Sequence, residues 1–203
     1  LALLGWSPGD DREKMSREEL IEAFTIERAL CSPAQFDIRK LTNMNGAYIA
    51  EMDPADFRAQ IAPFIAKLCP EGVGSPILGK VADLMHSRTK TFADVAHWNY
   101  FFRKADELEY DPKGLKKLLG DDTVRKAVAE FGEKVKTLPS LTVQAIDDLI
   151  HSIEAENGIQ QDKLKQPLRI ASTGSTIGAG ICETIELLGA EESAVRIARA
   201  LSL

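Results

Sequence analysis

The residues with the clearest chemical potential lie between positions 163 and 182. This stretch contains three positive side chains, Lys163, Lys165 and Arg169, and no Asp or Glu. The chain as a whole is acidic, with 25 Lys and Arg against 31 Asp and Glu, so the lack of acids is a local feature. Positive groups around a centre rich in Gly, Ser and Thr favour an anionic partner.

Catalytic and metal-binding groups have little support in the sequence. The adjacent acids at 147–148 and 191–192 point about 100° apart on a helix, so neither pair can readily share one ion or substrate. The three histidines lack the spacing of metal ligands, and the three cysteines form no C-x-x-C pair. We therefore expect no metal site and no cofactor in this chain. Widely spaced cysteines favour a reducing, cytoplasmic location.

The elements that hold these residues are expected to be helices. Hydrophobic residues recur with a helical period nearly everywhere, and no segment alternates with a period of two, which predicts an all-α chain. Helix starts are marked by a capping box at Ser16 and Glu19 and by Asp53 before Pro54. Pro63 predicts a bend in the second of these helices. Later helices are expected at about 122–135, from 142, and at about 161–172, 179–188 and 191–201.

Two further segments are less regular. A helix is expected to begin after Ser32-Pro33 and to end near Asn45-Gly46, where the Asn-Gly pair is typical of a turn. The aromatic residues between 92 and 102 could stack on unpaired bases, but their apolar neighbours favour a hydrophobic core.

Composition limits the classes of protein that fit. At 203 residues and 44% hydrophobic content, the chain can form one large domain or two modest ones. No apolar run is long enough to span a bilayer, and no secretory signal opens the chain. The net charge of −6 argues against a nucleic-acid partner. That objection is limited, because charge can be segregated, and basic stretches without acids also occur at 86–90 and 113–117.

Motifs at both ends of the chain resemble bacterial glutamyl-tRNA synthetases. The C-terminal signature of that family has a Q-P-L-R run, a T-G turn and a helix ending in L-L-G, as at 166–169, 173–174 and 187–189 here. Further matches, in order, are 1–6 (LALLGW), 24–28 (FTIER), 36–41 (FDIRKL) and 45–49 (NGAYI). The resemblance runs along the whole chain and implies a protein that binds tRNA.

The two nucleotide-binding signatures of that family, similar to H-I-G-H and K-M-S-K-S, do not occur here. The run Lys14-Met15-Ser16-Arg17 resembles the second, but it follows the LALLGW motif and is interpreted as a helix start. The resemblance therefore implies the C-terminal part of a longer ligase without its catalytic domain. ATP and Mg would serve the parent enzyme, which joins glutamate to tRNA. This part would bind the anticodon loop, and we expect a monomer.

The implied fold is an irregular helical bundle with three parts. Residues 1–52 would be the remnant of a region that contacts the tRNA stem. Residues 53–111 and 112–203 would form two helical anticodon-binding subdomains. The best candidate boundary between them is the stretch from Tyr110 to Gly114.

The resemblance also implies which residues meet the anticodon. Arg169 matches the arginine that approaches the anticodon bases, although its charge alone is more typical of an ordinary salt bridge. Arg88 matches an arginine that reads the third anticodon base, and Lys90 is the fallback if the alignment slips. Lys163, in the basic stretch that leads to Arg169, is a further candidate.

Other candidates have a structural alternative. Positions that line the same groove in the family are matched by Gln166, Thr173, Gly178 and Ile181. For Thr173 and Ile181, a structural role in a turn or in core packing is as well supported as contact with the anticodon. His151 stands where the family has an arginine, and a surface histidine on a helix is the simpler interpretation.

A different class of protein also fits the composition. A helical protein-interaction module could use its acidic face to bind a partner protein, as the net charge of −6 favours. Titration with tRNA at several salt concentrations separates the two hypotheses, because RNA binding should weaken steeply with salt.

Overall fold

The computed structural model is built from helices and describes residues 2–10, 12–30 and 36–203. Within these residues there is no strand, and one isolated bridge joins Trp6 to Ala29, so the predicted all-α class is confirmed. The helices are α1 (Arg17–Ala23), α2 (Ile38–Ala50), α3 (Pro54–Leu68), α4 (Leu78–His86), α5 (Pro112–Leu118), α6 (Asp122–Lys134), α7 (Val143–Glu156), α8 (Lys165–Thr173), α9 (Ile181–Leu188) and α10 (Ala190–Ser202).

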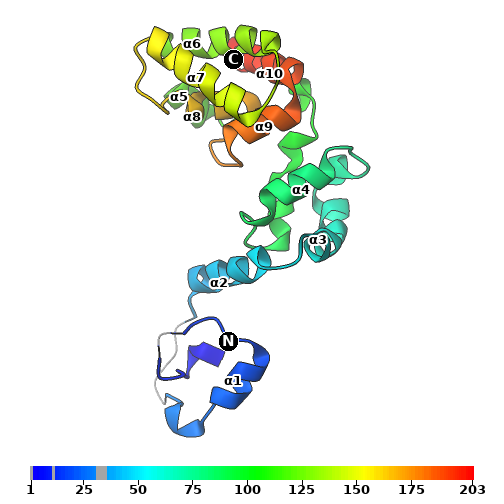
Figure 1. Ribbon diagram of the computed structural model, residues 1–203, viewed down its shortest axis with the longest axis vertical. Helices are drawn as coiled ribbons and strands as arrows, with labels where there is room; N and C mark the ends of the chain where they lie inside the picture. The colour runs from blue at the N-terminus through cyan, green and yellow to red at the C-terminus, as the bar shows by residue number, and fades with distance from the viewer. Residues whose placement is uncertain (1, 11, 31–35) are drawn as a thin grey trace.

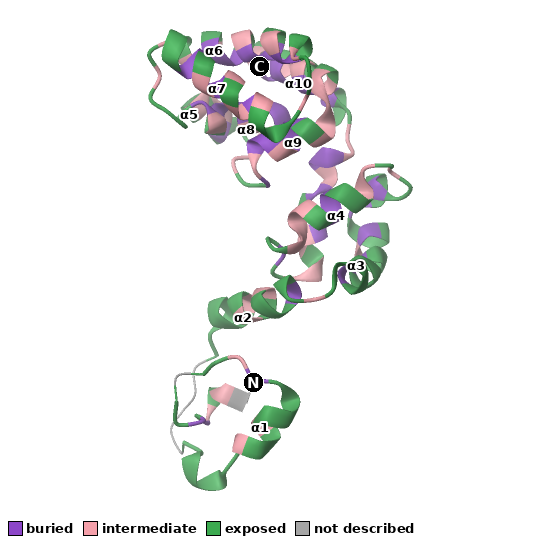
Figure 2. Ribbon diagram, in the orientation of Figure 1, coloured by how far each residue is buried: buried purple, intermediate pink, exposed green. Residues whose placement is uncertain are grey.

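The helices follow one another along the long axis of the molecule (Figure 1). The N-terminal segment with α1 forms one end, α2 leads from it to α3 and α4, and α5 to α10 gather at the other end. Buried residues concentrate in the middle and at the C-terminal end, whereas α1 contains none (Figure 2). No helix among the described residues combines the length and the apolar character needed to cross a bilayer.

Several helix starts follow from their cap residues. The Ser16 hydroxyl accepts a hydrogen bond from Glu19 N at 3.1 Å, and Ser16 N donates to the Glu19 carboxylate at 2.7 Å, which confirms the capping box. The Asp53 carboxylate accepts from Ala55 N at 2.8 Å and caps α3 as predicted. Helix α3 then continues through Pro63 without interruption.

The predicted end of α2 is wrong, and the reason is a distant contact. Helix α2 continues to Ala50 rather than ending near Asn45-Gly46. The Asn45 amide donates to Lys90 O at 2.5 Å, and the Lys90 side chain lies over Gly46. Tertiary packing therefore overrides the local turn signal. The predicted start of this helix, after Ser32-Pro33, lies outside the described residues.

Helix α8 begins at Lys165, which is later than predicted. The buried Glu154 carboxylate accepts hydrogen bonds from Asp162 N at 3.0 Å and from Leu164 N at 2.8 Å. These bonds hold the preceding residues in a turn, in which Asp162 has a positive φ of 63°. The turn fixes the point from which the helix with Arg169 begins.

The described residues contain two main hydrophobic cores. The first core lies around α3 and α4 and includes Trp98 and Tyr100, which confirms the aromatic stretch as core. The second core is formed by α6 to α10 and includes Phe131. Each core holds one buried cysteine, Cys69 in the first and Cys182 in the second.

A buried arginine joins the two cores. The Arg196 side chain on α10 is 1% exposed. It donates to Tyr100 O at 2.7 Å, to Ser172 O at 3.1 Å and to Arg103 O. Its Nε also pairs with Glu192 at 2.7 Å. Tyr100 lies in the first core and Arg103 follows it, so Arg196 ties the end of the first core to the second.

Candidate nucleic-acid interface

Two arginines from separate parts of the chain lie beside α9. Arg88 follows the last turn of α4, Arg169 lies in the middle of α8, and α9 packs against both helices. The Arg88 side chain is 42% exposed. Its Nη1 donates to Leu84 O at 2.8 Å, and its Nη2 lies 3.9 Å from the Glu183 carboxylate. The guanidinium is therefore anchored at one edge and open at the other.

Arg169 is the more buried of the two arginines. Its Nη1 donates to Ala179 O, and its Nε is buried without a hydrogen-bond partner among the described residues. Burial lowers the pKa of the Arg169 guanidinium, and the nearby positive charge of Arg88 lowers it further. Tyr100 and Glu183 oppose this shift. The positive charges of the two arginines therefore act on each other, and their mutual repulsion favours an anion or acceptor-rich group beside them.

A glycine allows the loop after α8 to approach Tyr100. A Cβ at Gly178 would lie 3.0 Å from the Tyr100 hydroxyl and 3.6 Å from Arg169 Nη1. The next residue, Ala179, donates its N–H to the same hydroxyl at 3.4 Å. Burial raises the pKa of Tyr100, so the hydroxyl stays neutral. The loop, the tyrosine and Arg169 therefore form one network of contacts.

Thr173 and Ile181 occupy buried positions beneath this surface. The Thr173 hydroxyl donates to Arg169 O at 2.8 Å and accepts from Ser175 N at 3.2 Å, which closes the end of α8. Ile181 belongs to the second core. This burial supports the structural interpretation of both residues, and contact of either one with RNA stays a prediction.

The remaining candidates separate into two places. Gln166 and Lys163 are exposed near the start of α8, and Gln166 lies one turn before Arg169 on the same face. Lys90 lies elsewhere, because its Nζ donates to Asn43 on α2 at 2.7 Å. The structure therefore places Gln166 and Lys163 near the Arg169 helix and directs Lys90 towards α2.

Lys165 is neutralised within the basic stretch. Its Nζ lies 2.7 Å from Asp147 and 2.6 Å from Asp162, and these carboxylates raise its pKa. His151 faces the same two carboxylates, at 3.8 and 3.3 Å. No group of three His, Cys, Asp or Glu side chains in the described part of the chain is arranged to hold a metal ion. Within this stretch, the positive charge left to meet an anion belongs to Arg169 and Lys163.

A second basic stretch lies beside α8. Helix α5 carries the exposed residues Lys113, Lys116 and Lys117. It packs closely against α8, because Gly114 leaves room for the Ile170 side chain where a Cβ would overlap it. The fold thus places a helix with three exposed lysines next to the helix that carries Arg169.

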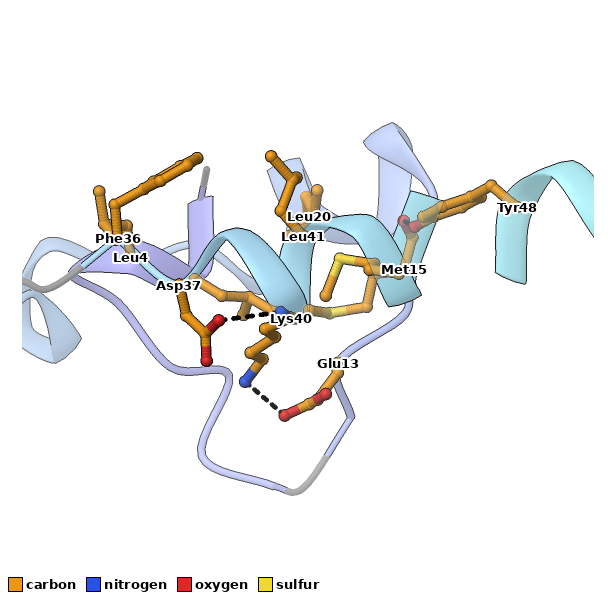
Figure 3. Close-up of a pocket in the computed structure, with 11 residues that line it drawn as sticks. Leu4, Glu13, Met15, Leu20, Phe36, Asp37, Lys40, Leu41 and Tyr48 are labelled. Carbon is orange, nitrogen blue, oxygen red and sulfur yellow. Dashed lines mark hydrogen bonds and ion pairs between the residues drawn. The ribbon is translucent and has the colours of Figure 1, made fainter. Parts of the chain in front are cut away.

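The pocket at the N-terminal end has a different character. Figure 3 shows it between the N-terminal segment and α2, with the apolar side chains of Met15 and Leu41 among those that line it. Lys40 Nζ pairs with Glu13 at 2.5 Å, and the Tyr48 hydroxyl donates to Met15 O at 2.7 Å. These contacts hold the segment against α2, and the pocket lies far from α8 and α9 along the molecule (Figure 1).

Known proteins are similar to this chain over nearly its whole length. A family model described as an anticodon binding domain matches residues 56–201. Glutamate–tRNA ligase 2 of Rubrobacter xylanophilus is 33% identical over 99% of this chain and 41% of its own length. Glutamate–tRNA ligase of Moorella thermoacetica is 35% identical over 98% and 42%. The crystal structure of glutamate-tRNA synthetase from Elizabethkingia anophelis superimposes with a TM-score of 0.76 at 25% identity, over 99% of this chain and 39% of that one. The chain therefore spans about two-fifths of the length of these relatives.

Proposed function

Because the chain belongs to the anticodon binding domain family, we propose that it recognises the anticodon loop of a tRNA within a glutamate–tRNA ligase. The main support is the convergence of Arg88 and Arg169 beside α9. Residues 53–111 and 112–203 would supply the recognition, and residues 1–52 would contact the tRNA stem. The whole enzyme would join glutamate to tRNA with ATP and Mg in a separate catalytic domain.

The chemistry of the surface suits unpaired bases. An anticodon loop presents splayed bases whose Watson–Crick edges are free. A guanidinium is planar and only donates hydrogen bonds, so it can bond a base edge, stack on a base or bond a phosphate. Arg88 is exposed and the Arg169 side chain is partly exposed, so both guanidinium groups can offer donors to a ligand. Lys163 and the exposed lysines of α5 add charge for the phosphates.

Salt dependence is the experiment that tests the proposal. We expect the logarithm of the association constant for glutamate tRNA to fall linearly with the logarithm of the salt concentration between roughly 50 and 200 mM. The slope should be about −0.7 for each single-strand phosphate that the protein neutralises. Fluorescence anisotropy with labelled tRNA measures this slope. Salt-independent binding, or none at the lowest salt, would contradict the proposal and favour the protein-interaction module with an acidic face.

Arg88 is proposed to discriminate at the third anticodon base, where glutamate tRNA has C and glutamine tRNA has G. Cytosine presents two acceptors to a guanidinium, whereas guanine presents two donors there. We expect Arg88→Gln to narrow the preference for glutamate tRNA about tenfold, mainly by admitting glutamine tRNA, because an amide accepts as well as donates. The ratio of the two binding constants measures the effect.

Two further variants make that result specific. Lys126 is exposed on α6, and Lys126→Gln removes one positive charge on another helix, so it should leave the ratio unchanged. Lys90→Gln also removes one positive charge, two residues along the chain from Arg88. The Lys90 side chain is directed towards α2. A narrowed ratio for Lys90→Gln with none for Arg88→Gln would transfer the proposed role to Lys90.

A further inference from the structure

One acidic side chain stands beside the two arginines. Glu183 is the first acid after the acid-free stretch and lies in the first turn of α9. Its carboxylate is 3.9 Å from Arg88 Nη2, and its charge acts on Arg169 as well. RNA phosphates repel a carboxylate, so Glu183 at an RNA-binding surface needs a contact that offsets the repulsion.

The carboxylate is open to a ligand. Its side chain is 36% exposed, and its one ion-pair partner among the described residues, Arg88, lies beyond hydrogen-bond distance. The carboxylate folds back over Gly180, where a Cβ would overlap its Oε2. A glycine at 180 thus makes room for this position of the side chain. The acceptor oxygens of Glu183 and the donors of Arg88 lie side by side at one surface.

We propose that Glu183 determines specificity by accepting a hydrogen bond from the amino group of cytosine at the third anticodon position. The inference rests on the proposed function and adds a negatively charged acceptor beside the guanidinium donors of Arg88 and Arg169. Cytosine presents an amino donor next to a ring-nitrogen acceptor and a carbonyl acceptor. An acceptor beside a guanidinium matches that order, with Glu183 at the amino group and Arg88 at the acceptors.

This acceptor would exclude uracil, which has one acceptor in common with cytosine for Arg88. Uracil places a carbonyl where cytosine has its amino group, so the Glu183 carboxylate would meet another acceptor. Guanine places its carbonyl there too, and its donors also oppose Arg88. After U at the first two anticodon positions, C specifies glutamate, U lysine and G glutamine. Glu183 would therefore act chiefly against the lysine anticodon, as Arg88 acts against the glutamine anticodon.

The test compares RNA stem–loops with the anticodons UUC, UUU and UUG. Their affinities are measured for the wild-type chain and for Glu183→Gln. A glutamine amide keeps an acceptor for cytosine and also offers a donor to the uracil carbonyl. We expect the preference for UUC over UUU to fall about tenfold, through tighter binding of UUU. UUG should gain less, because Arg88 still opposes its donors.

Glu191→Gln is the matched control, because Glu191 is exposed on α10 and this substitution removes the same negative charge as Glu183→Gln. This variant should keep the wild-type preference. Equal gains on all three hairpins would show that Glu183 acts through its charge alone and would overturn the inference, as would an unchanged ratio of UUC to UUU. Failure of the wild-type chain to bind any hairpin would overturn the proposed function itself, so the two failures are distinguishable.

Discussion

Replacing Arg196 with methionine should lower the free energy of unfolding by about 3–5 kcal/mol. Methionine fills much of the arginine volume but leaves the buried carbonyls of Tyr100 and Ser172 and the partly buried carbonyl of Arg103 without this donor. Each buried polar group left unsatisfied costs about 1–3 kcal/mol, and partial access of water reduces the sum. Glu192 adds little, because its side chain is 34% exposed and its charge can be hydrated.

Urea denaturation followed by circular dichroism measures this loss. Lys126→Met, on the exposed face of α6, is the control and should change the unfolding free energy by less than about 0.5 kcal/mol. A loss below about 1 kcal/mol for Arg196→Met would show that the three carbonyls find other donors. The tie between the two cores would then rest on other contacts, such as the bond from Arg199 to Ala105 O.

Replacing Arg169 with alanine should weaken tRNA binding by about 1–3 kcal/mol, the size of one good base contact. The helix itself should persist, because alanine favours helices and the Arg169 side chain is only partly buried. Part of the loss would come from the loop, since Ala179 O loses the guanidinium that holds it. Anisotropy titration with tRNA, beside a thermal melt of each variant, separates affinity from stability.

Arg169→Lys separates the contribution of the positive charge to tRNA affinity from that of the planar guanidinium group. Lysine keeps the positive charge but loses the planar fork, so it should restore phosphate attraction without restoring base contact. We expect it to recover only a minor part of the lost affinity. Unchanged affinity for Arg169→Ala, with an unchanged melt, would remove Arg169 from the interface.

The sequence predicted features that depend on neighbouring residues. The capping box at Ser16 and Glu19 and the cap at Asp53 are local hydrogen bonds, and both occur as expected. The end of α2 and the start of α8 were not predictable, because Lys90 and Glu154 impose them from distant positions. A local pattern of residue types does not indicate such long-range contacts.

In the candidate interface, too, the sequence indicated single residues but not the contacts between distant parts of the chain. Motif matches indicated Arg88 and Arg169 separately, and the resemblance to glutamyl-tRNA synthetases that suggested them is confirmed by the relatives of this chain. Their proximity to each other and to Glu183 depends on how α9 packs against α4 and α8. Glu183 had one local signal, as the acid that ends the acid-free stretch. The contact of Tyr100 with the loop after α8 had none, because only the fold brings them together.

The two buried cysteines make the opening of each core separately observable. Burial raises the pKa of Cys69 to about 11 and that of Cys182 to about 12, so neither forms the reactive thiolate at neutral pH while its core is closed. With Cys31 replaced by serine, the rate at which a thiol reagent labels each site would report how often that core opens. Equal labelling rates at Cys69 and Cys182 would mean that the two cores open as one cooperative unit. Unequal labelling rates would identify the core that opens more often.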